Sequence, residues 1–320
     1  MRRFPLAAAL LLLALAAEAQ VPRAVLSELN SATWCGYCPR ARAGLDVMLG
    51  RYDSIEFDTI DIMASSGGLS CPDSDARIAY YAVSGYPTLE FNGGNTMVGA
   101  GTDAIDGGVY DPVVRSLLDD PTPVAMAITD HAFVAGAAHV DVHVALEGDL
   151  PAGGSPRLRV ALVEDGLSYS GVAYDNVLRG IIADLDLAIA AAGESVDKTF
   201  AFTMDPAWNA ANLRAVAFVQ DDADRAILQA CNTRPAPAYG LRYYAAGTTT
   251  VVGAGEVVFD AAGLFNTGLN ADVYTVSLDT ANLPAGGSAH VTGNAGSFSS
   301  ADVALAPGER ALFHVAVDIG

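Results

Sequence analysis

Two cysteines lie between a stretch that predicts a strand and a stretch that predicts a helix, and this arrangement constrains the fold more than any other feature. The segment reads Trp34-Cys35-Gly36-Tyr37-Cys38-Pro39, after a predicted strand over 25–29 and before a helical pattern over 39–50. Unpaired backbone N–H groups and the dipole at a helix N-terminus favour a thiolate. The pattern therefore predicts Cys35 as an attacking thiol and Cys38 as the thiol that resolves a mixed disulfide.

Strands and helices alternate through the rest of the first region. A strand over 55–62 changes the phase of its alternation at Thr59, and a helix is expected over 73–82, capped by Asp73 or Ser74. A strand at 88–91 runs into an Asn-Gly hairpin turn, and a helix over 111–118 closes the unit before the linker 119–123. Such interleaving predicts an α/β layer fold.

After Pro123 the chain changes to short alternating strands separated by Gly, Pro and Asp turns. This pattern predicts a β-sandwich, followed by a second Pro-containing linker at 232–237 and another all-β unit. The predicted strands are 124–128, 139–146, 158–163, 196–203, 215–220 and 225–230, then 272–278 and 311–317. The expected divisions are residues 1–19, 20–120, 121–237 and 238–320.

Residues 1–19 have the pattern of a signal peptide. Two arginines precede an apolar run, and Ala17-Glu18-Ala19 predicts cleavage before Gln20. An uncleaved membrane anchor is the alternative, although the run is shorter than the roughly 20 residues that span a bilayer. No later segment is long and apolar enough to do so. We therefore expect an exported protein of the periplasm, the outer-membrane surface or the extracellular space, without a transmembrane segment after cleavage.

The chain is strongly acidic, with 17 basic and 37 acidic residues and a formal net charge of −20. Such a charge repels nucleic acid and anionic lipid, so neither is an expected partner. The expected partners are protein thiols or disulfides, or a redox partner protein, with cell-surface association as a further expectation. No cofactor is expected.

The cysteine segment, together with Gly85-Tyr86-Pro87-Thr88-Leu89 about fifty residues later, resembles the thioredoxin superfamily. The resemblance implies that Pro87 is a cis-proline packed against the cysteines. It also implies that Trp34, Tyr37, Tyr86 and Pro87 shape the substrate site. One departure is visible, because this family has a buried acid six residues before the first cysteine and this chain has Leu29 there. Glu28 is adjacent, but in a strand it faces the other side of the sheet.

A metal site and a redox-inert disulfide are the alternatives to redox chemistry for the cysteine pair. A structural zinc site needs four ligands in most cases, and neither a second Cys-x-x-Cys nor a nearby histidine follows. A redox-inert structural disulfide in an exported fold is the stronger alternative.

The chain has two further cysteines, Cys71 and Cys231, which remain once Cys35 is paired with Cys38. Exported proteins favour oxidised cysteines, so these two are predicted as a structural disulfide between units. An exposed Cys71 thiol that resolves Cys35, or two buried free thiols, stay open as alternatives.

Two polar groups outside the cysteine site contain residue types that can bind metal ions. His139, Asp141 and His143 share one strand face, where at most two of them could reach one ion because outer neighbours are roughly 13 Å apart. Asp221-Asp222-Ala223-Asp224 has the composition of a turn, with incidental calcium binding as the alternative. A solvated face and a turn are the preferred interpretations, and no metal is predicted.

Segments of the middle region, with the upstream unit, resemble the family related to the twenty-eight-kilodalton outer-membrane protein. They are Val160–Asp165, Tyr174–Arg179, Trp208-Asn209 and Ala217–Gln220. The segments Asn266–Gly268 and Leu305–Glu309 resemble immunoglobulin-like accessory domains. The implied fold is α/β plus all-β: a thioredoxin-like fold followed by two immunoglobulin-like β-sandwich domains.

Two functions follow from these observations. The first is an exported thiol–disulfide oxidoreductase that uses Cys35 and Cys38 on protein substrates. The second is a non-catalytic surface protein that uses the same module and its β-sandwiches for interaction.

Overall fold

A computed structural model describes residues 21–65, 68–245, 256–281, 283, 286–293 and 296–318. The signal peptide predicted over 1–19 lies outside these residues. In the part of the chain that is described, no helix is both long and apolar enough to cross a membrane.

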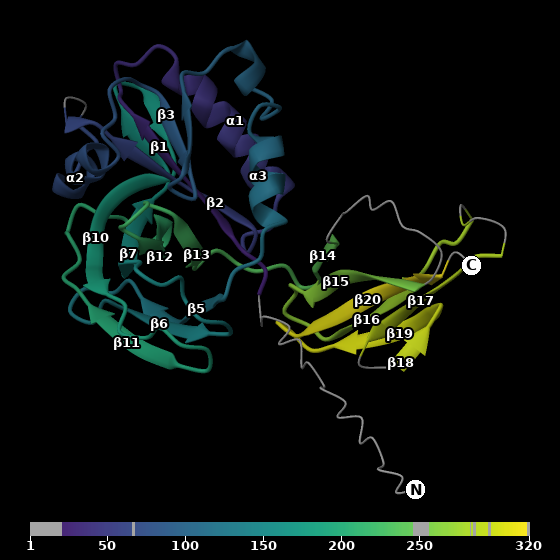
Figure 1. Cartoon of the computed structure of the whole chain (residues 1–320). Helices are drawn as coiled ribbons and strands as arrows, with labels where there is room; N and C mark the ends of the chain where they lie inside the picture. The colour runs from purple at the N-terminus through teal and green to yellow at the C-terminus, as the bar shows by residue number, and fades with distance from the viewer. Residues whose placement is uncertain are drawn as a thin grey trace, which may run out of the picture.

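The first region forms a four-stranded sheet with helices on both faces (Figure 1). The strands lie in the order β2-β1-β3-β4, in which β2 and β1 are parallel and β3 and β4 continue the sheet in antiparallel fashion. Helices α1 and α3 share one buried cluster with β1, β2 and β3, while α2 packs on the opposite face. The elements are β1 (Val25–Ser31), α1 (Cys38–Arg51), β2 (Phe57–Met63), α2 (Pro72–Tyr80), β3 (Thr88–Phe91), β4 (Asn95–Val98), a 3₁₀ turn (Thr102–Ala104) and α3 (Asp111–Leu118).

Local sequence explains these elements, with two differences from prediction. Gly44 lets α1 approach the neighbouring loop, because an added Cβ would lie 2.0 Å from the Ala104 carbonyl oxygen. β2 begins at Phe57, two residues later than predicted. The change of phase predicted at Thr59 is confirmed, because Phe57 packs with α1 and α3 whereas Ile60 and Ile62 pack on the opposite face of this strand. The N-cap of α2 is Cys71, whose thiol contacts Ser74, in place of Asp73 or Ser74.

The middle region has two sheet layers, one of which continues the sheet of the first region. The joint is a parallel pairing of Val177 in β10 with Asp61 in β2, which gives eight strands in the order β13-β12-β7-β10-β2-β1-β3-β4. This continuity was not predicted, and neither was β10 itself. The strands are β5 (Val124–Ala132), β6 (His139–Leu146), β7 (Pro156–Glu164), β8 (Leu167–Tyr169), β9 (Val172–Tyr174), β10 (Val177–Asp186), β11 (Ser195–Ala201), β12 (Leu213–Asp221) and β13 (Ile227–Asn232).

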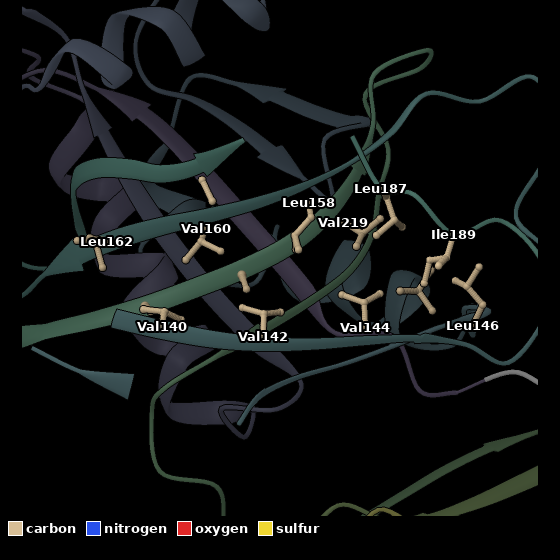
Figure 2. Close-up of a cluster of buried hydrophobic side chains, with 14 residues drawn as sticks. Val140, Val142, Val144, Leu146, Leu158, Val160, Leu162, Leu187, Ile189 and Val219 are labelled. Atoms are coloured by element: carbon tan, nitrogen blue, oxygen red, sulfur yellow. The ribbon is translucent and has the colours of Figure 1, made fainter. Parts of the chain in front are cut away.

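The second layer consists of β11, β6 and β5 and covers one face of β7 and β12. Figure 2 shows Val140, Val142 and Val144 of β6 directed toward Leu158 and Val160 of β7. The alternation of polar and apolar residues along 139–146 therefore places its valines in a core, as predicted for a sandwich.

The other face of β7 and β12 packs against the first region. Leu26 and Ile60 meet Val163 and Phe218 in one cluster of buried side chains. The sheet curls so that β13 lies against β1, where the Gln229 side chain accepts the Ala24 N–H at 2.8 Å and donates to the Pro22 carbonyl at 2.9 Å. The first and middle regions therefore share a core.

The C-terminal region is all-β where it is described, as predicted. A five-stranded sheet, β14-β15-β20-β17-β18, packs on the pair β16-β19 around Leu264, Leu305 and Phe313. Ion pairs connect it to the other regions, among them Arg242 with Glu56 at 3.1 Å. The strands are β14 (Leu241–Ala245), β15 (Glu256–Asn266), β16 (Asp272–Ser277), β17 (Ser288–Gly293), β18 (Gly296–Phe298), β19 (Ser300–Leu305) and β20 (Arg310–Asp318).

A buried polar network holds the shared core together. Arg77 of α2 donates to both carboxylate oxygens of Glu28 in β1, at 2.9 and 2.5 Å, and to Oε1 of Gln220 in β12 at 2.9 Å. The Tyr81 hydroxyl bonds to the same carboxylate and accepts from Gln220. Glu28 and Arg77 are almost fully buried, so each charge depends on the other for compensation.

Replacing Glu28 with Ala is expected to lower the free energy of unfolding by about 3–5 kcal/mol, because the buried Arg77 charge loses its partner. The double variant Glu28→Leu/Arg77→Met should recover most of that loss. The measurement is urea unfolding, with Arg115→Ala as the control, since its exposed i,i+4 pair with Asp111 contributes below about 1 kcal/mol. Equal stability of Glu28→Ala and the control would contradict this account.

Candidate active site

Cys35 and Cys38 form a disulfide at the start of α1. Cys35 is 8% exposed and Cys38 is fully buried, so Cys35 is the less buried of the two residues. The pair rests on Ala32 and Ala64, with Ile78 and Tyr86 at the border of the cluster. The attacking role of Cys35 and the resolving role of Cys38 stay predictions.

The helix N-terminus acts on the Cys35 sulfur. The Cys38 N–H donates to Cys35 Sγ at 3.1 Å, while Tyr37 at the N-cap gives no side-chain cap. Pro39 follows without an N–H to satisfy, and no acidic residue lies in the first turn to oppose a negative charge. The sulfur thus occupies the position where a helix stabilises an anion.

Aromatic side chains surround the disulfide. Trp34 and Tyr37 are 62% and 58% exposed, and the Trp34 ring meets Tyr86 edge-on at 5.7 Å between centroids. The Tyr86–Pro87 peptide is cis, as the resemblance implied. The Gly99 N–H donates to the Pro87 carbonyl at 2.8 Å and so ties this loop to the end of β4. The predicted residues of the site are therefore gathered at one end of the sheet.

A buried carboxylate that the prediction did not assign lies under α1. Asp61 of β2 pairs in register with Leu29 of β1, and both face α1 because paired residues of parallel strands share a side. Pro39, Arg42 and Asp61 line one cavity of about 200 Å³. The neighbouring strand thus brings an acid beside the position where Leu29 departs from the thioredoxin pattern. Its sequence signal is a lone carboxylate between Ile60 and Ile62.

Arg42 and Ser31 bind this carboxylate. Arg42 Nε donates to Asp61 Oδ2 at 2.6 Å and its Nη2 to Ser31 Oγ at 2.9 Å, while Ser31 Oγ donates to Asp61 Oδ1. The Arg42 guanidinium also stacks on Tyr174 of β9 at 4.7 Å. Burial raises the pKa of Asp61, against the opposing effects of the Arg42 charge and the Ser31 hydrogen bond.

The predicted disulfide between Cys71 and Cys231 is wrong, since both are free cysteines. Alternate residues of β13 face opposite sides, so Ala230 enters the cluster that Cys71 borders whereas Cys231 packs on the cluster between the sandwich layers. The sheet lies between the two thiols. Burial raises the pKa of Cys231 to about 12, which keeps this thiol protonated.

The histidine face differs in detail from expectation. His139 and Asp141 form a group with Asp130 of β5, and the possible metal-ligand atoms of these three residues lie within 4.8 Å of one another. His143 is not part of this group and forms a hydrogen bond with Asp197 at 2.7 Å. A shift of register after Ile128 places Asp130 opposite Asp141. Asp130 is 72% exposed, and we assign no metal role to this group.

The acidic run at 221–224 is a turn, as preferred. Asp221 accepts the backbone N–H groups of Ser155 and Ala223, and Asp224 accepts that of Ala226. Asp222 pairs with Arg159 at 2.9 Å. These hydrogen bonds and this ion pair give the carboxylates of the turn a structural role.

Comparisons with known proteins bear on the fold. No family of known sequences and no curated protein matches the chain. Among solved structures, HBP35 of Porphyromonas gingivalis superposes with a TM-score of 0.54 at 16% identity, over 78% of this chain and 95% of that one. A β-glucosidase from Kluyveromyces marxianus gives a TM-score of 0.22 at 18% identity, over 39% of this chain and 16% of that one, which carries no argument. The similarity to HBP35 shows a thioredoxin-like domain followed by β domains.

The Asp61 environment predicts a pH-dependent stability in the variant Arg42→Met. Without the guanidinium the pKa of Asp61 in the folded state lies further above its unfolded value near 3.9. At a pH between these two pKa values the folded state therefore binds more protons than the unfolded state. The free energy of unfolding should then fall as pH rises from about 4 through the folded pKa, by about 3 kcal/mol in total.

Urea unfolding over this pH range measures the effect, and Arg42→Met/Asp61→Asn is the matched control in which the slope should disappear. An identical pH dependence in the two variants would show that Asp61 is not the titrating group.

Proposed function

We propose that this protein is an exported thiol–disulfide oxidoreductase acting on protein substrates through Cys35 and Cys38. The observation that carries the proposal is the position of Cys35, the less buried cysteine of the pair, at an uncapped helix N-terminus among exposed aromatic side chains and beside cis-Pro87. Export rests on the leader pattern of residues 1–19. Membership in the family related to the twenty-eight-kilodalton outer-membrane protein belongs to the same proposal.

The chemistry needs two exchange steps. In the reducing direction, the Cys35 thiolate attacks one sulfur of a substrate disulfide, forming a mixed disulfide and releasing a substrate thiolate. The Cys38 thiolate then attacks Cys35 Sγ, which forms the Cys35–Cys38 disulfide and releases the second substrate thiol. The substrate gains two electrons and the protein loses two. The oxidising direction is the reverse.

We propose that Asp61 accepts the proton released in the resolving step. Cys38 is fully buried, and its thiol must lose a proton before it can attack. A carboxyl held in the same part of the fold with a raised pKa is suited to accept that proton. In this proposal Asp61 is a proton acceptor supplied by β2.

Cysteine variants test the proposal directly. Cys35→Ser should abolish reduction of insulin disulfides, and Cys38→Ser should accumulate mixed disulfides visible by mass spectrometry, because the resolving attack is missing. Redox titration with thiol mapping should give a two-electron couple between about −270 and −120 mV. Cys71→Ser and Cys231→Ser are the matched controls and should retain activity.

The surface-protein alternative makes the opposite prediction. If wild type and Cys35→Ser are equally inactive, and the disulfide resists reduction at all potentials in that range, the enzymatic proposal fails.

The exposed aromatic residues should matter for protein substrates in particular. Trp34→Ala is expected to lower kcat/KM for a protein disulfide by about tenfold, since buried aromatic anchors at an interface contribute more than about 1 kcal/mol. The rate with a small aromatic disulfide should change little. Tyr239→Ala, which removes an aromatic ring of similar exposure from the C-terminal region, is the control. Equal losses with both substrates would argue for a general defect of the site.

A further inference from the structure

The cysteine site carries a positive charge that the exchange chemistry does not use. Arg40 follows Cys38 by two residues in the first turn of α1, and its guanidinium carbon lies 5.1 Å from the centroid of the Tyr37 ring. Tyr37 lies between the two cysteines in the sequence and is 58% exposed, while Arg40 is half-buried. The guanidinium is therefore held against the exposed aromatic residue of the disulfide segment.

Arg40 has no carboxylate partner among the described residues. Of the basic side chains in this part of the chain, only Arg40, Arg225 and Lys198 are in no ion pair. The chain has 37 acidic and 17 basic residues, so an arginine without an acid is an exception in this protein. The first turn of α1 contains no acidic residue either. The charge of Arg40 is thus left for a bound molecule to compensate.

The contact with Tyr37 prepares this charge for a carboxylate. A guanidinium that lies over an aromatic ring still has the N–H groups at its edge for hydrogen bonds. These donors form a planar fork that matches the two oxygens of a carboxylate. Because the ring restricts the arginine side chain beforehand, less conformational freedom is lost when a carboxylate binds. Arg40 is therefore suited to recognise an acidic side chain of a substrate.

The other side of the site is negative. Asp75 of α2 is exposed, and burial and the charge of Asp75 raise the pKa of the nearby Tyr86, which borders the disulfide. Helices α1 and α2 pack on opposite faces of the sheet, so Arg40 and Asp75 approach the disulfide from different faces. A substrate carboxylate is favoured on the side of Tyr37 and disfavoured on the side of Tyr86.

The net charge of the whole chain does not cancel this selectivity. A charge of −20 opposes the approach of acidic molecules in general. At physiological ionic strength this repulsion is screened beyond about 8 Å, whereas the contact with a guanidinium acts at hydrogen-bond distance. Arg40 thus distinguishes substrates by the position of an acid next to their cysteine and not by their total charge.

We propose that Arg40 is a specificity-determining residue that selects substrates with an Asp or Glu close to the reacting cysteine. The substrate carboxylate accepts hydrogen bonds from the Arg40 guanidinium while the substrate sulfur meets Cys35. A lysine at the same place in the substrate is repelled. The inference rests on the proposed exchange at Cys35 and adds the class of substrate, which is a protein disulfide flanked by acidic residues.

Peptides with one cysteine, joined by a disulfide to thionitrobenzoate, test this inference on the reduced protein. Asp, Asn or Lys is placed two residues before or two residues after the cysteine, since such neighbours lie roughly 6.6 Å apart in an extended peptide. Attack of the Cys35 thiolate on the peptide sulfur releases thionitrobenzoate, which is followed by absorbance, and Cys38 then releases the peptide thiol. Each rate constant is divided by that of the same peptide with dithiothreitol, which removes differences in intrinsic reactivity.

In at least one placement the Asp peptide is expected to react about fivefold faster than the Asn peptide, a ratio in the range of exposed ion pairs, and the Lys peptide more slowly than either. The ratio should fall toward one as ionic strength rises from about 0.05 to about 0.5 M. Arg40→Gln should make the Asp and Asn peptides equal, and Arg40→Lys should keep most of the preference. Arg225→Gln is the matched control, because Arg225 also forms no ion pair and lies over a tyrosine ring, that of Tyr80.

The salt series uses the wild type, so it tests the inference even if a variant does not fold. The inference is overturned if the Asp and Asn peptides react equally in both placements, if salt does not change their ratio, if folded Arg40→Gln keeps the wild-type preference, or if Arg225→Gln loses it. Failure of the proposed function looks different: the Asn peptides would then release thionitrobenzoate equally fast with wild type and with Cys35→Ser.

Discussion

The ion pair between Glu28 and Arg77 is the interaction on which the arrangement of the first two regions depends. A buried carboxylate and a buried guanidinium are tolerable only when each compensates the other, and here Gln220 and Tyr81 satisfy the remaining donors and acceptors. The partners come from β1, α2, β12 and the end of α2. The network therefore specifies how the helix and the middle sheet are placed on the central strand, which apolar packing alone would leave less defined.

Short motifs predicted the thioredoxin-like unit well because their chemistry is local. The cysteine segment and the Asn-Gly turn each determine their own backbone, and the resemblance to thioredoxins implied the cis peptide. The structure has the helix start, the cis peptide and the hairpin where they were expected. The joined sheet was not predictable in the same way. Its pairing of Val177 with Asp61 links residues far apart in sequence, and β10 contains Gly180 and two register shifts that obscure its alternation.

The same distinction applies to the candidate site. The two cysteines could be predicted from their spacing and the aromatic residues from the resemblance to thioredoxins, whereas Asp61 required the register of β1 and β2. The failed pairing of Cys71 with Cys231 has a related cause. Counting cysteines along the sequence does not show which face of a strand each thiol occupies. The alternation of side chains along β13 places Cys231 on the face away from Cys71.

The joint between β2 and β10 also has a consequence for self-association. In a four-stranded sheet of this order β2 would be an open edge, with unpaired backbone groups able to recruit another chain. The pairing with β10 begins to cover that edge, and the sheet continues until β13 lies against β1. On the other side the sheet ends in β4, a strand of four residues followed by Gly99 at positive φ. Short or covered edges are a common protection against strand-to-strand aggregation, and such protection suits a protein whose acidic charge already opposes association.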